Sequence, residues 1–431
     1  MNRALSKGTH AEMAFRYVRA AFAVALGLGC LAAAPAGAQG GAAAAAGLPT
    51  PLAPPPMPAR TAPVGLPQDA GPHDAATIEW WYYNAFLTTE SGKRYAVVAS
   101  FFRTGLTKEK KGHYLIYSLA DLDAKKKTAY SVLDRSNREL LKSLMPLVAQ
   151  LKPEDPKPLQ LLALLQKDRL PEPHRAFPGV AKVTTAPRFS IALGEENRLE
   201  QATDDARTWK AALRGDDFAL DLTLAQPDRP LMLVGGVGKT GLNRPDDMFY
   251  VSLTRMAASG TLTRGEKAEK VTGVGWLDRQ WGSSWVVGDN GWDWFGVQLA
   301  DGSDLIVYRI KDNATGRTLR TEATLLKPDG VQVVDRDVTF TPRGAWTDPK
   351  TAIKYPAAFG VKLNTLGHAL TMTPAFPDQT IPVIGIGDAI WEGVVNVTGR
   401  AKDGSAVTGR GYMELVGYRA AASGAARKGT R

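Results

Sequence analysis

One pattern occurs twice in the sequence, and this repeat limits the fold more than any other feature. The segment VTGVGWLD at residues 271–278 returns as VTGRGYME at residues 407–414. The aromatic segment WWYY at residues 80–83 likewise resembles WDWF at residues 292–295, and a Ser-Gly or Asp-Gly turn follows each of them. The chain is therefore predicted to contain two copies of one unit, each with an aromatic first strand and a Gly-x-aromatic-x-acid last strand.

Short alternating runs between these segments predict antiparallel strands. Rich in Val, Tyr, Trp and Thr, these runs include residues 95–102 and 218–224, and turn residues such as those at 90–92 separate them. If the first and last strands of each unit meet, the unit closes into a barrel without exposed edges. We therefore predict an all-β protein of two tandem antiparallel barrels, spanning residues 72–286 and 287–419.

One segment of the first unit breaks the β pattern and predicts a helical insertion at residues 135–171. Ser136 and Glu139 fit a capping box, and leucines at helical spacing follow them. Pro146 is expected to kink or shorten this helix, and a second helix is expected to stop before Pro171. The insertion either covers one end of the barrel or acts as a lid.

The residue pattern at the N-terminus predicts that the protein is exported. Arg16 and Arg19 precede the apolar run 20–34, and small residues follow it, so residues 1–38 are predicted to be a cleaved signal peptide. The only cysteine, Cys30, lies inside this peptide. Cleavage leaves a periplasmic or secreted protein, and lipid attachment at Cys30 is the alternative.

Composition predicts a disordered linker at residues 39–71, rich in Ala and Pro, and a disordered tail at residues 420–431. The net charge is +10, but several basic residues belong to the signal peptide and the tail. We expect no nucleic-acid partner for an exported protein. Peripheral contact with a membrane and contact with envelope transport machinery remain open alternatives.

Histidines are scattered, and no pair of them has the spacing of a metal site. Outside the signal peptide they stand at His73, His113, His174 and His368. We therefore expect neither a metal nor a cofactor.

Taken together, the motifs resemble the lipocalin-like superfamily of hydroxyneurosporene synthase, the carotenoid 1,2-hydratase, and most of all its secreted AttH-like branch. The motifs that carry the resemblance are EWWYY at 79–83, YVSLTRM at 250–256, WLDRQWG at 276–282, GWDWFGVQL at 291–299, WEG at 391–393 and GRGYMELVGY at 409–418. The resemblance implies two tandem lipocalin-like barrels and a hydrophobic ligand, isoprenoid or lipid-like.

In the carotenoid hydratase branch, the resemblance also implies addition of water to an isoprenoid double bond without a cofactor, with an aspartate as the acid. The Tyr-x-Asp pattern of that branch falls on Trp276-Leu277-Asp278, so tryptophan replaces its tyrosine. Its His-x-Trp pair has no counterpart here, because no histidine stands between His174 and His368. A hydratase or isomerase is therefore one hypothesis, and a non-catalytic periplasmic lipid carrier and a secreted hydrolase are the alternatives.

Asp278 is the first candidate catalytic residue. Protonation of an alkene requires an acid that stays neutral until it acts, and apolar surroundings such as Trp276 raise the pKa of a carboxyl group. The structural alternative is an ion pair with Arg279 or Arg255, and the repeat places Glu414 at the equivalent position. Glu79 is the second candidate acid.

The candidate ligand-binding residues are mostly aromatic side chains of the predicted strands. About half of the aromatic side chains on each strand should face inward, where they serve either as ordinary core or as a ligand platform. The set comprises Trp80, Trp81, Tyr82, Tyr250, Arg255, Trp276, Trp281, Trp292 and Trp294.

Overall fold

The computed structural model describes eleven stretches of the chain, namely residues 57–58, 60, 62–105, 109–151, 153, 156–226, 228–241, 247–283, 290–313, 315–384 and 389–420. The predicted signal peptide with Cys30, residues 39–56 of the predicted linker, and the tail after residue 420 lie outside these stretches.

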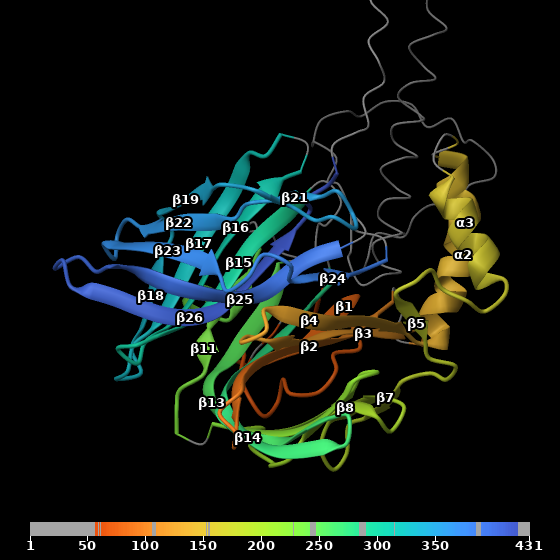
Figure 1. Cartoon of the computed structure of the whole chain (residues 1–431), viewed down its shortest axis with the longest axis horizontal. Helices are drawn as coiled ribbons and strands as arrows, with labels where there is room; N and C mark the ends of the chain where they lie inside the picture. The colour runs from red at the N-terminus through yellow and green to blue at the C-terminus, as the bar shows by residue number, and fades with distance from the viewer. Residues whose placement is uncertain are drawn as a thin grey trace, which may run out of the picture.

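The first half of the described chain forms one large curved sheet (Figure 1). All its strand pairs are antiparallel except the pair of β4 and β5. In spatial order, the strands are β5 (His174–Ala176), β4 (Lys126–Leu133), β3 (Gly112–Asp121), β2 (Arg94–Thr104), β1 (Ile78–Thr89), β14 (Lys267–Gly282), β13 (Met248–Arg264), β10 (Phe218–Ala225), β9 (Thr208–Arg214), β8 (Asn197–Gln201), β7 (Ser190–Leu193) and β6 (Lys182–Thr184). Beside β13 lie β11 (Met232–Leu233) and β12 (Lys239–Thr240), joined by the short 3-10 helix η1 (Val234–Gly236).

The second half forms a second antiparallel sheet. Its strands in spatial order are β18 (Gln332–Asp335), β17 (Thr318–Leu326), β16 (Asp304–Asp312), β15 (Asn290–Leu299), β26 (Ala406–Val416), β25 (Ala389–Arg400), β23 (His368–Pro374), β22 (Ala358–Leu363) and β19 (Val338–Arg343). β24 (Thr380–Pro382) pairs with β25, and β20 (Trp346–Thr347) and β21 (Lys354–Tyr355) form a small hairpin.

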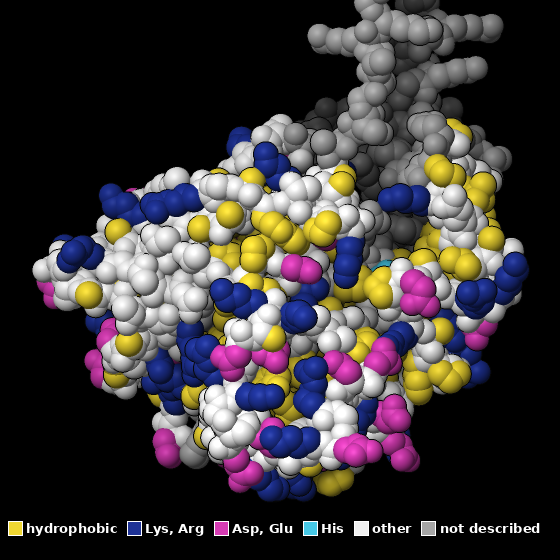
Figure 2. All heavy atoms as spheres, viewed as in Figure 1, with side chains coloured by type: hydrophobic (Ala, Val, Ile, Leu, Met, Phe, Trp, Pro, Cys, Tyr) yellow, Lys and Arg dark blue, Asp and Glu magenta, His cyan; other side chains and the backbone are white. Residues whose placement is uncertain are grey.

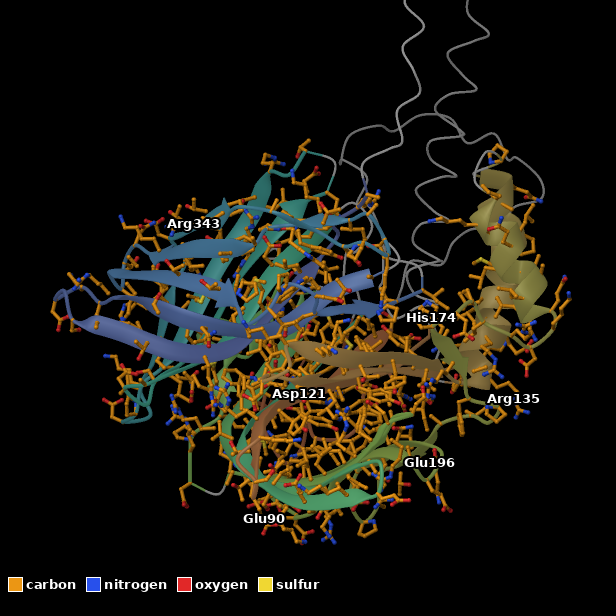
Figure 3. The ribbon with its side chains drawn as sticks, in the orientation of Figure 1. Glu90, Asp121, Arg135, His174, Glu196 and Arg343 are labelled. Atoms are coloured by element: carbon orange, nitrogen blue, oxygen red, sulfur yellow. The ribbon has the colours of Figure 1, made fainter. Side chains whose placement is uncertain are left out.

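Alternation along the strands explains how both faces of each sheet become buried. On β1, Trp81 belongs to the core inside the first sheet, whereas Tyr82 belongs to an apolar layer that also includes Trp294 and Tyr412 of the second sheet. Successive side chains of a strand point to opposite faces, so each strand feeds two cores. Figure 3 shows side chains filling the inside of the first sheet. The described residues therefore form three large apolar cores, one inside each sheet and one between the sheets, and a small separate cluster contains Ala76, Val251 and Trp281.

The all-β class and the two tandem lipocalin-like barrels are confirmed, but the predicted closure of each barrel is wrong. The first and last strands of each unit do pair, β1 with β14 and β15 with β26. These pairs lie in the middle of their sheets, and the hydrogen-bonded paths end at β5 and β6 in one sheet and at β18 and β19 in the other. Among the described residues, the end strands of a path do not pair with each other, so neither barrel is completely closed.

The predicted helical insertion forms α2 (Arg135–Leu151) and α3 (Lys157–Leu165), between β4 and β5. The capping box at Ser136 is wrong: the Asp134 carboxylate accepts a hydrogen bond from the backbone N–H of Asn137 at 2.9 Å, so the cap lies two residues earlier and the helix begins at Arg135. Pro146 lies inside α2 and does not end it. Leu141 and Leu165 pack into the layer between the sheets. Apolar side chains also gather on the surface over α2 and α3 (Figure 2).

Residues 62–71, which composition assigned to the linker, pack against the first sheet. The indole N–H of Trp81 donates to the Ala70 carbonyl at 2.8 Å, and buried Asp69 pairs with Arg60 at 2.8 Å. His73 then stacks on Trp281 with ring centroids 4.3 Å apart. The packed chain therefore begins before residue 72, because these few polar and aromatic contacts hold a segment whose composition alone favours disorder.

Candidate functional site

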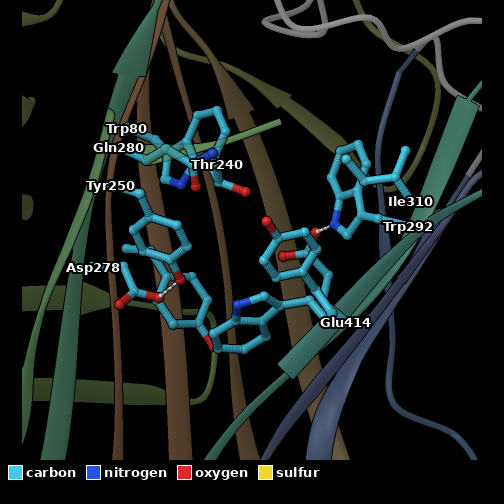
Figure 4. A pocket seen from close by; sticks show the side chains of 11 residues that line it. Trp80, Thr240, Tyr250, Asp278, Gln280, Trp292, Ile310 and Glu414 are labelled. Carbon is cyan, nitrogen blue, oxygen red and sulfur yellow. Dashed lines mark hydrogen bonds between the residues drawn. The ribbon is translucent and has the colours of Figure 1, made fainter. Parts of the chain in front are cut away.

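A cavity lies between the two sheets, in the apolar layer that they share, and its empty space is about 510 Å³ when the solvent space at its opening is included (Figure 4). Strands β1, β12, β13 and β14 supply one wall, and β15, β16 and β26 supply the other. The lining residues are Trp80, Tyr82, Thr240, Tyr250, Asp278, Gln280, Trp292, Trp294, Tyr308, Ile310 and Glu414. The resemblance to lipocalins predicts a ligand inside a barrel, but described side chains fill both barrel interiors and this cavity lies between them.

A second pocket adjoins the first; its empty space is about 640 Å³, solvent space at its opening included, and its lining is mostly apolar. The two pockets share Trp80, Tyr82, Trp292 and Glu414. Val98, Ser100 and Phe102 of β2 line the second pocket, because these alternate residues face away from the core inside the first sheet. The other lining residues are Ile78, Tyr114, Ile116, Ile381, Val383, Ile390, Glu392 and Val416.

Asp278 stands in the first cavity with hydrogen-bond donors but no cation. Its Oδ2 accepts from the Tyr250 hydroxyl at 2.7 Å, and its Oδ1 accepts from the Ser252 hydroxyl and the Trp276 indole N–H, each at 2.5 Å. No Lys or Arg within the described stretches forms an ion pair with it. The alternative of an ion pair with Arg279 or Arg255 is therefore wrong.

Burial raises the pKa of Asp278 to about 7, against the three hydrogen bonds from Ser252, Tyr250 and Trp276, which lower it. The negative charge of Glu414 raises this pKa further. At neutral pH a large fraction of Asp278 is thus a neutral carboxylic acid inside an aromatic cavity. Such a group can donate a proton to a bound molecule.

Glu414 faces the same cavity from the second sheet. Figure 4 shows Asp278 with Tyr250 on one wall and Glu414 with Trp292 on the other. The Trp292 indole N–H donates to Glu414, and Glu392 lies directly opposite Glu414 in the pairing of β25 and β26. The repeat explains this arrangement, because equivalent last strands turn their acids toward the layer between the sheets.

Glu79 lies on the opposite face of β1, outside the cavity. Its carboxylate accepts from Arg103 at 2.7 Å and from Arg279, and from the backbone N–H of His73 at 3.0 Å. Burial opposes ionisation, but the charges of Arg279, His73 and Arg103 outweigh it and lower the pKa of Glu79 to about 2. This group is a permanently ionised member of a buried ion network.

Asp293 repeats this arrangement in the second unit. It is buried and pairs with Arg309 and, at 2.6 Å, with Lys311, while the Tyr418 hydroxyl donates to it at 3.0 Å. Each unit therefore carries an ion-paired acid on its first strand, and on its last strand an acid that forms no ion pair with any described Lys or Arg.

Three candidate ligand-binding residues are not brought to the cavity. Trp81 and Trp281 point to the other faces of β1 and β14, and the Arg279 guanidinium lies 4.0 Å from the ring centre of Trp81. Arg255 pairs with buried Asp304 at 2.8 Å and donates to the Ser303 carbonyl, which ties the first sheet to the second. The structure does bring five of the candidates together around Asp278, namely Trp80, Tyr82, Tyr250, Trp292 and Trp294. Trp276 donates a hydrogen bond to Asp278.

Sequence reasoning missed Glu392 and the apolar second pocket. Glu392 stands in the WEG motif at 391–393, and its place opposite Glu414 depends on the register of β25 and β26, which the repeat did not provide. Within the described stretches, no three His, Cys, Asp or Glu side chains gather as metal ligands, and no helix is long and apolar enough to cross a membrane.

Comparisons with known proteins place the chain in a family. A solved AttH structure from Nitrosomonas europaea is 27% identical, with a TM-score of 0.64, and the match covers 84% of this chain and 99% of that one. Kievitone hydratase from Nectria haematococca is 16% identical, with a TM-score of 0.60 and coverage of 84% and 97%. CghA in complex with Sch210972 is 14% identical, with a TM-score of 0.54 and coverage of 84% and 94%. These last two likenesses concern the fold.

The search of curated proteins returned no match. The family model described as AttH-like matches residues 57–131 and 168–418, and the segment that it leaves out contains α2 and α3. This match covers most of the chain and confirms the resemblance found in the sequence. The chain belongs to the AttH-like family.

Proposed function

We propose that this protein is a cofactor-independent hydratase that adds water to a carbon–carbon double bond of an apolar, isoprenoid or lipid-like molecule. The observation that carries the proposal is Asp278, a fully buried acid with three hydrogen-bond donors and no cationic partner among the described residues. Asp278 is the proposed acid, and the cavity between the sheets is the proposed binding site.

The cavity suits the charge that develops when an alkene is protonated. The proton goes to one alkene carbon and leaves positive charge on its neighbour. Trp80, Tyr82 and Trp294 line the same cavity, and aromatic faces attract a nearby cation by about 0.5–2 kcal/mol. A water molecule then attacks the cationic carbon and completes the alcohol.

The name of one similar structure agrees with this proposal. Kievitone hydratase carries the name of a water-adding enzyme, and a second similar structure, CghA, holds the small molecule Sch210972. We extend a hydratase-type reaction to this chain on the strength of Asp278 and its cavity. We also propose that the protein acts after export, in the periplasm or outside the cell, as its signal-like N-terminus indicates.

Isotope labelling tests the reaction. The apolar compound that co-purifies with the protein, together with squalene, lycopene and oleic acid as probes, would be incubated in H2¹⁸O and analysed by mass spectrometry. We expect one ¹⁸O atom in the alcohol product, and at least a hundredfold less label with Asp278→Asn. Bound compound without label in any of the four incubations would contradict the hydratase and support a lipid carrier.

Ser100→Leu is expected to weaken apolar binding. Ser100 is buried and lines the second pocket, so a leucine there fills space that an apolar chain would occupy. Loss of a few methylene contacts reduces affinity by about tenfold or more. The measurement is a fluorescence titration with cis-parinaric acid. Thr398→Leu, an equally apolar change at an exposed position of β25, is the matched control and should bind as the wild-type protein does. Equal affinities for both variants would place the ligand elsewhere.

A further inference from the structure

The second sheet contributes two adjacent carboxyl groups to the two pockets. Glu392 and Glu414 face each other across β25 and β26; Glu392 is buried and lines the second pocket, and Glu414 is half-buried and lines both pockets. The Tyr82 hydroxyl donates to Glu392 at 3.0 Å, and the Trp292 indole N–H donates to Glu414. Within the described stretches, no Lys or Arg forms an ion pair with either carboxyl group.

Two adjacent carboxyl groups in an apolar layer cannot both ionise without a large cost, so they share one proton. Burial and then the charge of Glu414 raise the pKa of Glu392 well above its usual range. Burial also raises the pKa of Glu414, but hydrogen bonds from Glu392 and Trp292 oppose this rise. Glu392 is therefore the neutral donor, and Glu414 is the member that ionises first.

A weakly partnered polar group in the same cavity points to a bound oxygen atom. Nε1 of Trp294 is buried and contacts the Tyr250 hydroxyl, but it makes no hydrogen bond of good geometry with any described acceptor. A buried N–H without an acceptor costs about 1–3 kcal/mol. Because Trp294 and Glu414 both line the cavity, an oxygen placed between them would satisfy this donor.

We propose that Glu414 is the catalytic base that activates the attacking water, that Glu392 is its positioning residue, and that the Trp294 N–H orients the same water. This proposal rests on the proposed function and deepens it. Asp278 and Glu414 then act from opposite walls, one from each sheet, on a molecule held between them.

The step balances with water as the only co-reactant. The Asp278 carboxyl transfers its proton to one alkene carbon, and the π electrons form the new C–H bond. An electron pair of water forms a C–O bond to the adjacent carbon, and the surplus water proton passes to Glu414. The products are the alcohol, an ionised Asp278 and a protonated Glu414, and proton exchange with water restores both acids.

The adjoining apolar pocket defines the kind of substrate. Glu414, Trp80, Tyr82 and Trp292 line both pockets, so the two meet at the proposed reaction centre. The second pocket extends away between apolar side chains of β2, β3, β24 and β25. The substrate is therefore an apolar chain whose reacting double bond lies at the junction, with the rest of the chain in the second pocket.

Double labelling separates the base from the acid. With a substrate that the wild-type protein hydrates, Glu414→Gln is expected to lower ¹⁸O incorporation by at least a hundredfold. The same variant should still exchange deuterium from D2O into the alkene, because Asp278 still protonates carbon. Asp278→Asn should lose both labels, and Glu90→Gln at an exposed turn should lose neither. Full ¹⁸O incorporation by Glu414→Gln overturns the role of Glu414. Normal activity of Asp278→Asn overturns the proposed function instead.

Glu392 is tested by the pH dependence of turnover. Glu392→Gln keeps a neutral N–H donor toward Glu414 and should retain turnover within about tenfold of wild type. Glu392→Met removes the donor, so the pKa of Glu414 rises and the acidic limb of the profile should move to higher pH. An unmoved acidic limb would overturn the positioning role. If Glu392→Met fails to fold, infrared spectra decide: the wild-type protein should keep a protonated-carboxyl band at pH 8 that Glu392→Gln lacks.

Discussion

Asp278→Asn is expected to be more stable than the wild-type protein at pH 8, although it loses turnover. Above its pKa of about 7, wild-type Asp278 is a buried charge that pairs with no Lys or Arg of the described stretches. Asparagine keeps an oxygen that accepts from Ser252 and Trp276, and the Tyr250 hydroxyl can reverse its role and accept from the amide. A rise of about three pKa units corresponds to about 2–4 kcal/mol of lost stability at pH 8.

The sign of the pH dependence follows from proton binding. Between pH 4 and pH 7 the folded protein keeps the Asp278 proton and the unfolded chain releases it, so stability falls as the pH rises. The asparagine variant has no titrating group at this position, so its stability lacks this fall with pH. Urea unfolding of both proteins at pH 5 and pH 8 should therefore give a stability difference that favours the variant more at pH 8.

Asp335→Asn is the matched control for this measurement. Asp335 is also buried, but it accepts hydrogen bonds from the backbone N–H groups of Asp337, Thr365 and Leu366. Its amide cannot accept all of them, so this variant should be destabilised at pH 8. If Asp278→Asn were destabilised to the same degree, Asp278 would be an ordinary structural carboxylate.

Glu79→Ala is expected to cause the largest loss of stability, about 3–5 kcal/mol, because it leaves Arg279 buried without its carboxylate. The Arg279 guanidinium is almost fully buried between Trp81 and Trp281, where water cannot replace the lost partner. Chemical unfolding at pH 7 measures the loss. Asp123→Asn, which breaks an exposed ion pair with Arg94, is the control and should leave stability unchanged.

Glu79 also has a pH dependence opposite to that of Asp278. Because its pKa is lowered to about 2 in the folded protein, its contribution is present above about pH 4.5 and is lost as the pH falls toward 2. An acid transition that the Glu79→Ala variant shares unchanged with wild type would contradict this assignment.

The repeat and the alternation predicted most of the fold. The similarity of the first and last strands in the two units correctly predicted that β1 pairs with β14 and β15 with β26. Alternation also implied that Trp80 and Trp81 face opposite sides of one strand. The sequence did not show which face of the strand binds a ligand. The layer between the sheets forms only when two curved sheets pack against each other, and no local sequence pattern shows that packing.

The candidate site was predicted only in part, because some of its contacts are local in sequence and others are not. Asp278 and its aromatic neighbours follow from a local motif, whereas the ion network of Glu79 depends on Arg103, Arg279 and His73, which lie far apart in sequence. Asp278 and Glu414 occupy equivalent positions of the repeat, which favoured a shared structural role. In the structure both acids instead face one cavity, since the two units present equivalent faces to each other.

The proposed reaction requires that Asp278 be a neutral acid at neutral pH, and an infrared titration tests this most directly. Difference spectra of the wild-type protein against Asp278→Asn, between pH 4 and pH 9, isolate the protonated-carboxyl band of Asp278. We expect this band to persist at pH 6 and to disappear with a midpoint near pH 7. A band already lost at pH 5 would show that Asp278 is an ordinary ionised carboxylate and would contradict its role as the acid.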